Sequence, residues 1–160
     1  MIDLSPAQAA DRIAKLLVTP ESRTLDFKRI SDKHKKIIET VCAFANSEGG
    51  LLALGVGDAK DLRAGDKPQS RLWGVEENPE GFDDLRRLLL QRFTPALPRL
   101  HWLRMPCTLR DGKPGHVVLL RVEKSNQVHS VVGNGTWTRM DASNRELSAA
   151  EIADLTYQRG

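Results

Sequence analysis

The sequence contains only two cysteines, Cys42 and Cys107, and neither belongs to a CxxC pair or to a Cys/His cluster with zinc spacing. This scarcity argues against a disulfide framework, and no zinc is expected. Cys42 lies in an apolar stretch with helical spacing, where a cysteine is ordinarily a small buried hydrophobic residue. The four histidines are scattered and accompany no GxSxG serine motif, so a triad hydrolase finds no support.

Long apolar runs are also missing. No segment of the 160 residues is apolar enough to cross a membrane, and the opening MIDLSPAQAADRIAKLL lacks the basic, apolar and small-residue regions of a secretory signal. A chain of this length, 40% hydrophobic and 28% charged, is the size of one domain with its own core. We therefore expect a single cytoplasmic domain over residues 1–160, with no membrane partner.

Glycine-rich phosphate loops are absent as well. There is no GxxxxGK[ST] sequence, and Gly55-Val56-Gly57 is too short for a dinucleotide fingerprint. ATP is therefore not an expected cofactor.

The patterns that are present alternate between helix and strand. Ser5, followed by proline and then by Gln8 at the third position, is a helix start signal, and Ser148 with Glu151 forms a second capping box. The expected helices run from Ser5 to about residue 18, from Ser31 or Asp32 to the glycines at 49–50, from Asn78 to about residue 93, and from Ser148 onward.

Strands are expected between these helices. In the segment 24–29, Leu25 and Phe27 face one side while Asp26 and Lys28 carry charge outward. Further strands are expected at 51–56, at 100–105 paired with 116–122, and at 128–132 paired with 136–140 across Gly133 to Gly135. This order predicts an α+β fold with one mixed β-sheet flanked by helices.

Three carboxylates, those of Glu21, Asp26 and Asp58, stand beside a basic run. Acidic groups within a basic surface are the ingredients of a site that holds nucleic acid or cuts it with a metal ion. The net charge of +3 and a pI near 9.0 favour polyanionic partners only mildly, so the position of the charge matters more. The basic run consists of Lys28, Arg29, Lys33, His34, Lys35 and Lys36.

Two interpretations of the carboxylates stay open. Converging on one strand end, they would suit Mg²⁺ or Mn²⁺, which prefer oxygen ligands, provided that the chain turns at Glu21 or Ser22. Alternatively, Glu21 and Asp26 pair with neighbouring cations, and Asp58 stabilises the turn after a buried strand. The basic run has the same two interpretations, because a charged helix face is usually solvated, yet this one opens a helix whose free N–H groups favour phosphate.

Trp137 and Arg139 share one face of an expected strand. There the indole would stack on a base while the guanidinium pairs with a phosphate. Packing of Trp137 in the core is the alternative. Asn46 and Ser47, at the turn after the second helix, are expected mainly to satisfy helix carbonyls.

Several of these motifs together resemble the Schlafen-type AlbA domain. The resemblance rests on Glu21, Asp26-Phe27-Lys28, AFANS at 43–47, Gly49-Gly50, and LGVGD at 54–58. It continues through Gly74-Val75, Pro95-x-Leu97, Trp137-x-Arg139 and the tail at 148–155, and it covers about residues 13–157.

The resemblance implies nucleic-acid binding, to RNA or DNA. Bacterial and archaeal members resemble DNA-binding or regulatory modules. Animal Schlafen proteins include endoribonucleases that cut transfer and ribosomal RNA with three acidic residues and a divalent metal, and those residues match Glu21, Asp26 and Asp58. The family usually has Glu at position 26, and the zinc ligands and second lobe of the animal enzymes are missing here. A horseshoe-shaped RNA channel would require a homodimer.

The sequence thus predicts a nucleic-acid-binding module of Schlafen AlbA type. Its alternative function is that of a divalent-metal-dependent endoribonuclease acting on structured RNA. The expected contact surface comprises Lys28, Arg29, Lys33, Lys35, Lys36, Trp137 and Arg139, and the expected catalytic and metal-binding residues are Glu21, Asp26 and Asp58.

Overall fold

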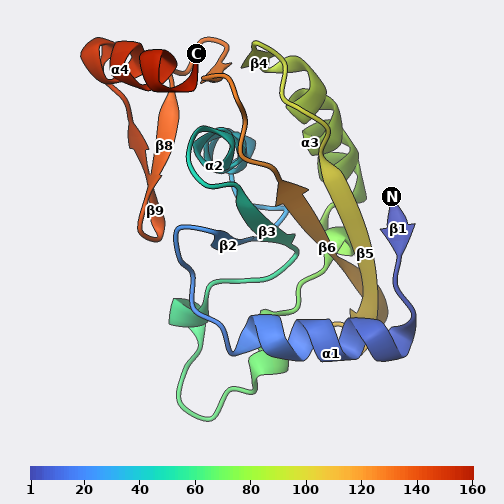
Figure 1. Ribbon diagram of the computed structural model, residues 1–160. Helices are drawn as coiled ribbons and strands as arrows, with labels where there is room; N and C mark the ends of the chain where they lie inside the picture. Colours follow the sequence, from blue (N-terminus) through green and yellow to red (C-terminus); the bar gives the residue numbers. More distant parts are fainter.

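The structure, a computed structural model, describes all 160 residues (Figure 1). None of its helices is both long and apolar enough to span a membrane. The helices are α1 (Pro6–Leu17), α2 (His34–Asn46), α3 (Pro79–Gln91) and α4 (Ala149–Arg159), with short 3₁₀ turns η1 (Ala59–Asp61), η2 (Pro68–Arg71) and η3 (Val75–Glu77). The strands are β1 (Ile2–Asp3), β2 (Leu25–Lys28), β3 (Gly50–Leu54), β4 (Phe93–Thr94), β5 (His101–Thr108), β6 (Pro114–Val122), β7 (Ser130–Val131), β8 (Trp137–Met140) and β9 (Ser143–Glu146).

Five strands form one mixed sheet in the order β1-β5-β6-β3-β2. The pairs β1–β5 and β2–β3 are parallel, whereas β5–β6 and β3–β6 are antiparallel. The hairpin expected at 100–105 and 116–122 is confirmed as β5–β6. The α+β fold with a mixed sheet flanked by helices is therefore confirmed.

The parallel pair β2–β3 fixes where the candidate site lies. Lys28 is in register with Leu54, and the Gly55 amide donates to the Lys28 carbonyl at 2.8 Å. Because the carboxyl ends of parallel strands meet at one edge of a sheet, the chain leaves β2 and β3 from the same place. The residues that follow the two strands, Arg29 and Asp58 among them, therefore gather at that edge.

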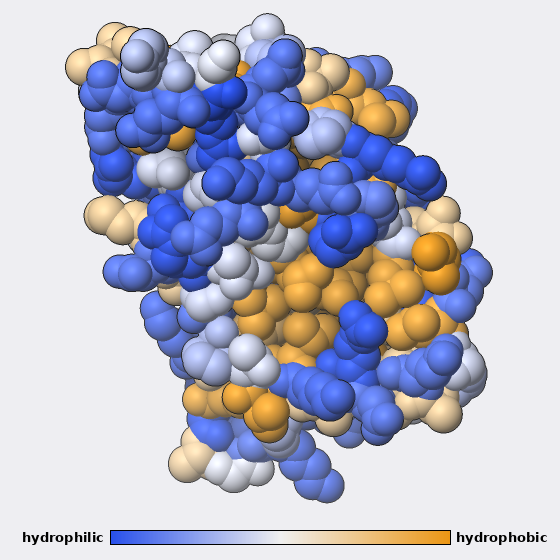
Figure 2. Space-filling view, viewed as in Figure 1, coloured by the Kyte–Doolittle hydropathy of each residue, from blue (hydrophilic) through white to orange (hydrophobic).

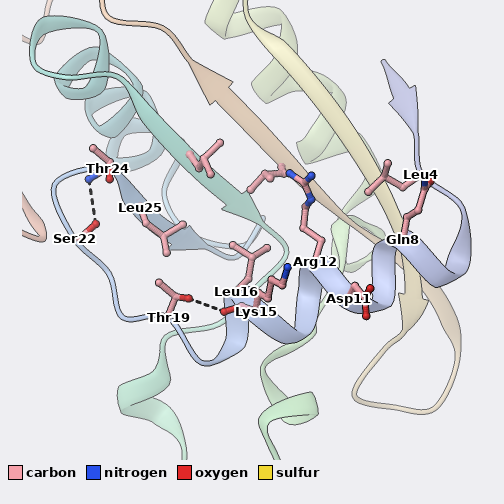
Figure 3. A pocket seen from close by; sticks show the side chains of 12 residues that line it. Leu4, Gln8, Asp11, Arg12, Lys15, Leu16, Thr19, Ser22, Thr24 and Leu25 are labelled. Carbon is pink, nitrogen blue, oxygen red and sulfur yellow. Dashed lines mark hydrogen bonds between the residues drawn. The ribbon is translucent and has the colours of Figure 1, made fainter.

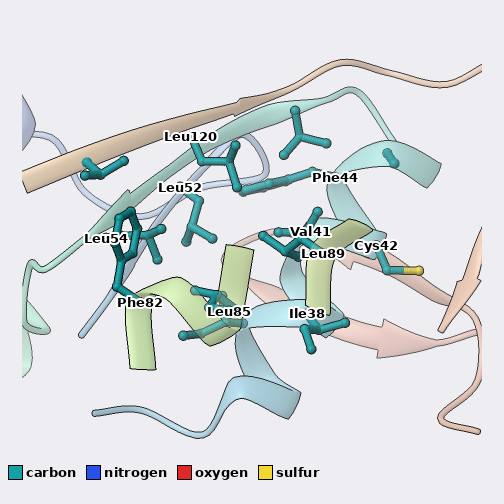
Figure 4. Packing of buried hydrophobic residues seen from close by; sticks show 14 of the residues in the cluster. Ile38, Val41, Cys42, Phe44, Leu52, Leu54, Phe82, Leu85, Leu89 and Leu120 are labelled. Atoms are coloured by element: carbon teal, nitrogen blue, oxygen red, sulfur yellow. The ribbon is translucent and has the colours of Figure 1, made fainter. Parts of the chain in front are cut away.

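Two hydrophobic cores form because both faces of the sheet are covered. On β3, Leu52 and Leu54 point into the larger core, together with side chains of α2 and α3, and Figure 4 shows Phe44 packed among them. Ala53 points the other way, into the core beneath α1. Figure 1 accordingly shows α2 and α3 on one side of the sheet and α1 crossing the other.

The helix starts at both ends of the chain follow the predicted capping boxes. The Ser5 hydroxyl accepts from the Gln8 amide, and the Ser148 hydroxyl accepts from the Glu151 amide, with each reciprocal bond also present. The expected cap of α2 is wrong: this helix begins at His34 without a side-chain cap. The Asp32 carboxylate instead accepts from the Arg29 amide at 2.9 Å, because it closes the turn before the helix.

The second expected hairpin is also wrong. Residues 137–140 do form β8, but β8 pairs with β9 across a turn in which Asp141 has φ of 52°. The glycine turn at 133–135 closes only a local bridge, with the Val131 amide donating to the Gly135 carbonyl at 2.7 Å. Strand β7 pairs with β4 instead. The hairpin β8–β9 lies on the side of α2 away from α3 (Figure 1).

Candidate functional site

Asp26 lies inside the molecule, although its strand pattern predicts an outward-facing carboxylate. Its alternation with Leu25 and Phe27 is as expected, but Thr40 of α2 and Arg139 of β8 contact its carboxylate, and Asp26 is only 2% exposed. Its Oδ2 accepts from Lys28 Nζ at 3.0 Å and from Arg139 Nη1 at 3.3 Å. The outward orientation is therefore corrected to a buried one with two cationic partners.

Glu21 reaches Asp26 because the chain turns between them. The Ser22 amide donates to the Leu25 carbonyl at 3.0 Å, which is the turn that the spacing of the two carboxylates requires. Glu21 Oε2 then accepts from the Phe27 amide at 3.1 Å. The same amide lies 2.8 Å from Asp26 Oδ1, so one backbone donor serves both side chains.

The pKa values of the two carboxyl groups are shifted in opposite directions. Burial, together with a hydrogen bond to Asp26, raises the pKa of Glu21 from 4.5 to about 7. Burial also acts to raise the pKa of Asp26, but the hydrogen bond from Glu21 and the charges of Lys28 and Arg139 outweigh it, so this pKa is lowered. The pair therefore consists of a protonated Glu21 and an ionised Asp26 at mildly acidic pH.

Asp58 is held apart from that pair by its role in a turn. Its Oδ1 accepts from the Lys60 amide at 2.9 Å and so begins η1. The charge of the Arg71 guanidinium interacts with both Asp58 and Glu21. The structure thus brings Glu21 and Asp26 into contact, and it relates Asp58 to them through an arginine.

These side chains do not fit a divalent ion in this arrangement. No group of three or more His, Cys, Asp or Glu side chains is placed to hold a metal. Asp26 accepts from Lys28 and Arg139, and Arg71 supplies positive charge beside Glu21 and Asp58. Cations of the protein itself already balance the acidic cluster.

The basic run divides into two parts. Lys28 and Arg29 are partly buried and paired, with Arg29 bound to Glu77 and stacked 3.5 Å above the centre of the Trp73 ring. Lys33, Lys35 and Lys36 are exposed around the first turn of α2; only Lys36 has an acidic neighbour, Glu39, at 3.7 Å.

Trp137 and Arg139 lie against the interior instead of on an open surface. The half-buried Trp137 donates from Nε1 to the Asn134 carbonyl at 2.7 Å and packs against the larger core. Arg139 is 2% exposed and donates to the carbonyls of Ser22 and Leu25. Asn46 likewise joins α2 to the segments around 129 and 137 through its amide group.

A second group of functional candidates was not apparent from the sequence. Arg71, Trp73 and Arg110 meet Arg29 beside Asp58, where they line a polar cavity of about 530 Å³. These residues come from three separate segments, and no local spacing relates them. One local signal exists, a tryptophan between Arg71 and Gly74 in an otherwise polar loop.

Another groove, of about 600 Å³, lies between α1 and the sheet. Figure 2 shows apolar side chains gathered on this face, and Figure 3 shows Leu16 and Leu25 in its wall with Arg12 and Lys15 at its rim. None of the expected site residues lines this groove.

Comparison with models of protein families shows which family the chain belongs to. A family model described as Schlafen, AlbA_2 matches residues 21–148, which include both carboxylates of the buried pair, Asp58, and the hairpin β8–β9. The chain belongs to the Schlafen AlbA_2 family. No curated protein matches it significantly.

A solved structure supports the fold of this Schlafen AlbA_2 domain. The crystal structure of the DIP2311 protein from Corynebacterium diphtheriae matches with a TM-score of 0.58 and 18% sequence identity. The match covers 96% of this chain but only 32% of that one. The Schlafen AlbA_2 chain thus spans about a third of the length of the larger protein and shares its fold over that part.

Proposed function

We propose that this protein binds nucleic acid through the phosphate backbone, at the first turn of α2. The observation that carries the proposal is the exposure of Lys33, Lys35 and Lys36 around a helix start without a side-chain cap. Family membership supports the same function, since the Schlafen AlbA_2 resemblance implies a nucleic-acid partner.

The physical reason lies in the free groups at this helix start. The first N–H groups of a helix have no partner within the helix, and the helix dipole favours an anion there. The first turn of α2 contains no acidic residue, and three ammonium groups surround it. A phosphate at this position would accept hydrogen bonds from the backbone and pair with the lysines.

A salt titration tests the proposal. Binding of a fluorescent single-stranded RNA and of a DNA of equal length would be followed by anisotropy at several salt concentrations. We expect replacement of Lys33, Lys35 and Lys36 by Gln to weaken binding. It should also reduce the slope of log affinity against log salt concentration by about 2 to 3, because one counterion fewer is released on binding for each phosphate contact that is lost.

A matched control variant has the same net charge as the triple lysine variant. Replacing Lys15, Arg87 and Lys124 by Gln removes three exposed cations that lie outside the first turn of α2. We expect this variant to keep most of the wild-type affinity and slope. Equal losses in both variants would show that only total charge matters, and a wild-type slope near zero would refute binding through phosphates.

A divalent-metal-dependent endoribonuclease is the second candidate, and it would require the three carboxylates, which offer no common metal position in this arrangement, to come together around the ion. It is favoured by the contact between Glu21 and Asp26, because a carboxyl group that titrates near pH 7 is suited to proton transfer. The test is incubation of end-labelled transfer RNA with Mn²⁺, Mg²⁺ or EDTA, beside an Asp58→Asn variant. Discrete cuts that require metal and vanish in the variant would establish the nuclease. Intact RNA in every lane, with binding retained, would leave a binding module.

A further inference from the structure

The cavity beside Asp58 has an excess of positive charge. It lies at the edge where β2 and β3 end, and Arg29 and Gly57, which follow those strands, form part of its wall. Five cationic side chains line it: Arg29, Lys60, Arg63, Arg71 and Arg110. Three carboxylates line it too, those of Asp58, Asp61 and Asp66.

Two of these carboxylates already accept hydrogen bonds from backbone amides of the loop. Asp58 accepts from the Lys60 amide at 2.9 Å, and Asp66 accepts from the Arg63 amide at 2.8 Å. Of the five cations, only Arg29 is in an ion pair, with Glu77. The other four cations, Lys60, Arg63, Arg71 and Arg110, form no ion pair, although the charges of Asp58 and Glu21 act on Arg71. This surplus of unpaired cations is an arrangement suited to an anion.

Arg71 is the buried member of this set. It is 3% exposed, its Nε donates to the Gly57 carbonyl at 2.9 Å, and its Nη1 donates to the Leu17 carbonyl at 3.2 Å. Its Nη2 is buried and has no partner. Asp58 and Glu21 already supply negative charge near this guanidinium, so what stays unmet is one hydrogen-bond donor, and an unmet buried donor is costly in free energy.

Arg29 and Arg110 are held rigidly by Trp73. Their guanidinium carbons lie 3.5 Å and 3.8 Å from the centre of the indole ring. Because both distances are close to the thickness of a ring, two guanidinium groups cannot share one face, so they lie on opposite faces. The indole is thus fully stacked and is not free to stack on a base, while both guanidinium groups are fixed for binding.

We propose that this cavity binds a phosphate monoester, carried by the end of a nucleic-acid strand or by a free nucleotide. Arginine forks match phosphate oxygens in pairs, and a concave site of this size admits a terminal nucleotide more readily than a strand passing through. The strand-end source rests on the proposed function, whereas the phosphate chemistry rests on the cavity alone.

Arg110 offers the safest variant because it is exposed, in the loop between β5 and β6. Arg110→Gln removes one fixed guanidinium and leaves the buried Arg71 in place. Arg87→Gln is the matched control: it removes an exposed arginine from α3 that does not line this cavity. Melting temperatures of both variants would confirm that they fold, and Arg71→Lys, which keeps the buried charge, provides a second test of the cavity.

The experiment compares one oligonucleotide with a 5′-phosphate, a 3′-phosphate or hydroxyl groups at both ends, with AMP titrated separately. We expect a terminal phosphate to tighten binding about tenfold, the effect of one or two charge-assisted hydrogen bonds. Arg110→Gln and Arg71→Lys should reduce this preference without weakening the hydroxyl-ended strand, and Arg87→Gln should retain it.

The outcomes separate the two proposals. Equal binding of all three oligonucleotides, with the lysines of α2 still required, would overturn the phosphate cavity and leave the proposed function intact. Failure of every oligonucleotide to bind would refute the proposed function. If AMP then still bound to the wild type and Arg110→Gln abolished this binding, the cavity would be assigned to a free nucleotide. If AMP did not bind either, the proposal of a phosphate cavity would be overturned as well.

Discussion

Asp26 and Arg139 lie 113 positions apart in the chain and form an ion pair at 3.3 Å, with 3% and 1% of their side chains exposed. The same guanidinium donates to the Ser22 and Leu25 carbonyls and to Asn144 Oδ1. It thereby ties the hairpin β8–β9 to the edge strand β2. The pair is a structural connection between the two ends of the family region, and it fixes the carboxylate in place.

Arg139→Met should destabilise the protein strongly. The substitution keeps most of the side-chain length but leaves Asp26 with Lys28 as its only cation, and it removes the donor to the Ser22 and Leu25 carbonyls. Removing one partner of a buried ion pair costs about 3 to 5 kcal/mol of unfolding free energy. We expect a decrease of that size in the free energy of unfolding, measured by urea denaturation.

Arg23→Met is the control for that experiment. Arg23 forms an ion pair with Glu48 at 3.4 Å in which the two side chains are 46% and 59% exposed, so its loss should change the free energy of unfolding by less than about 1 kcal/mol. If Arg139→Met were no more destabilising than Arg23→Met, the buried pair would not hold the hairpin to the sheet.

Asp26 also illustrates how far the sequence determines the fold. Alternation along 24–29 predicts which residues share a face, and the structure confirms it for Leu25, Asp26 and Phe27. That pattern cannot reveal that a hairpin more than a hundred residues later covers the second face, because the covering elements are set by long-range packing. The starts of α1 and α4 were more predictable, since a capping box depends on residues three positions apart.

Glu21→Gln should flatten the pH dependence of stability between about pH 4.5 and pH 7. Glu21 binds its proton more tightly in the folded protein, where its pKa is about 7, than in the unfolded chain, where it is near 4.5. Its contribution is therefore fully present below pH 4.5, declines as the pH rises, and is lost above pH 7. Glutamine resembles the protonated acid at every pH. The variant should therefore be the more stable protein at pH 8, by on the order of 1 kcal/mol once solvent screening of this partly exposed side chain is taken into account.

Chemical denaturation at pH 5, 6, 7 and 8 measures this difference. At pH 5 the variant and the wild type should have nearly equal free energies of unfolding. Glu48→Gln, a change at an exposed position, should retain the wild-type profile. The lowered pKa of Asp26 acts in the opposite direction and at lower pH, since its stabilisation is lost as the pH falls below 3.8. A Glu21→Gln profile parallel to that of the wild type would contradict the raised pKa of Glu21.

The candidate site was less predictable than the fold. The contact between Glu21 and Asp26 could be anticipated, because only a turn at Glu21 or Ser22 lets the two meet. The interaction of Arg71 with both Glu21 and Asp58 could not, because it depends on how the loop before α3 folds back onto the ends of β2 and β3. No periodicity encodes that return.

Both cysteines should react slowly with a thiol reagent in the folded protein. Burial raises the pKa of Cys42 and of Cys107 to about 11, so about one thiol in a thousand is ionised at pH 8. Ellman's reagent should therefore label neither residue within minutes under native conditions. In urea it should label both residues immediately. Rapid labelling of Cys107, the more exposed of the two, in native buffer would contradict this expectation.

Gly55→Ala should be more damaging than the same change at Gly65. Both glycines have positive φ, 94° and 89°, so alanine at either position carries a backbone strain of about 1 to 2 kcal/mol. At Gly65 a Cβ atom would meet nothing within 4 Å, whereas at Gly55 it would lie 2.8 Å from the backbone of Gly74.

That close approach positions the phosphate cavity, because the Gly55 carbonyl accepts from the amides of Trp73 and Gly74, both at 2.9 Å. An alanine at position 55 would push the loop away and displace Trp73 with its two arginines. We expect Gly55→Ala to lose more than about 3 kcal/mol of unfolding free energy, the strain and the clash together, while Gly65→Ala loses only the strain. Equal losses in urea denaturation would mean that the loop yields without cost, and the arginines around Trp73 would then not be rigidly held.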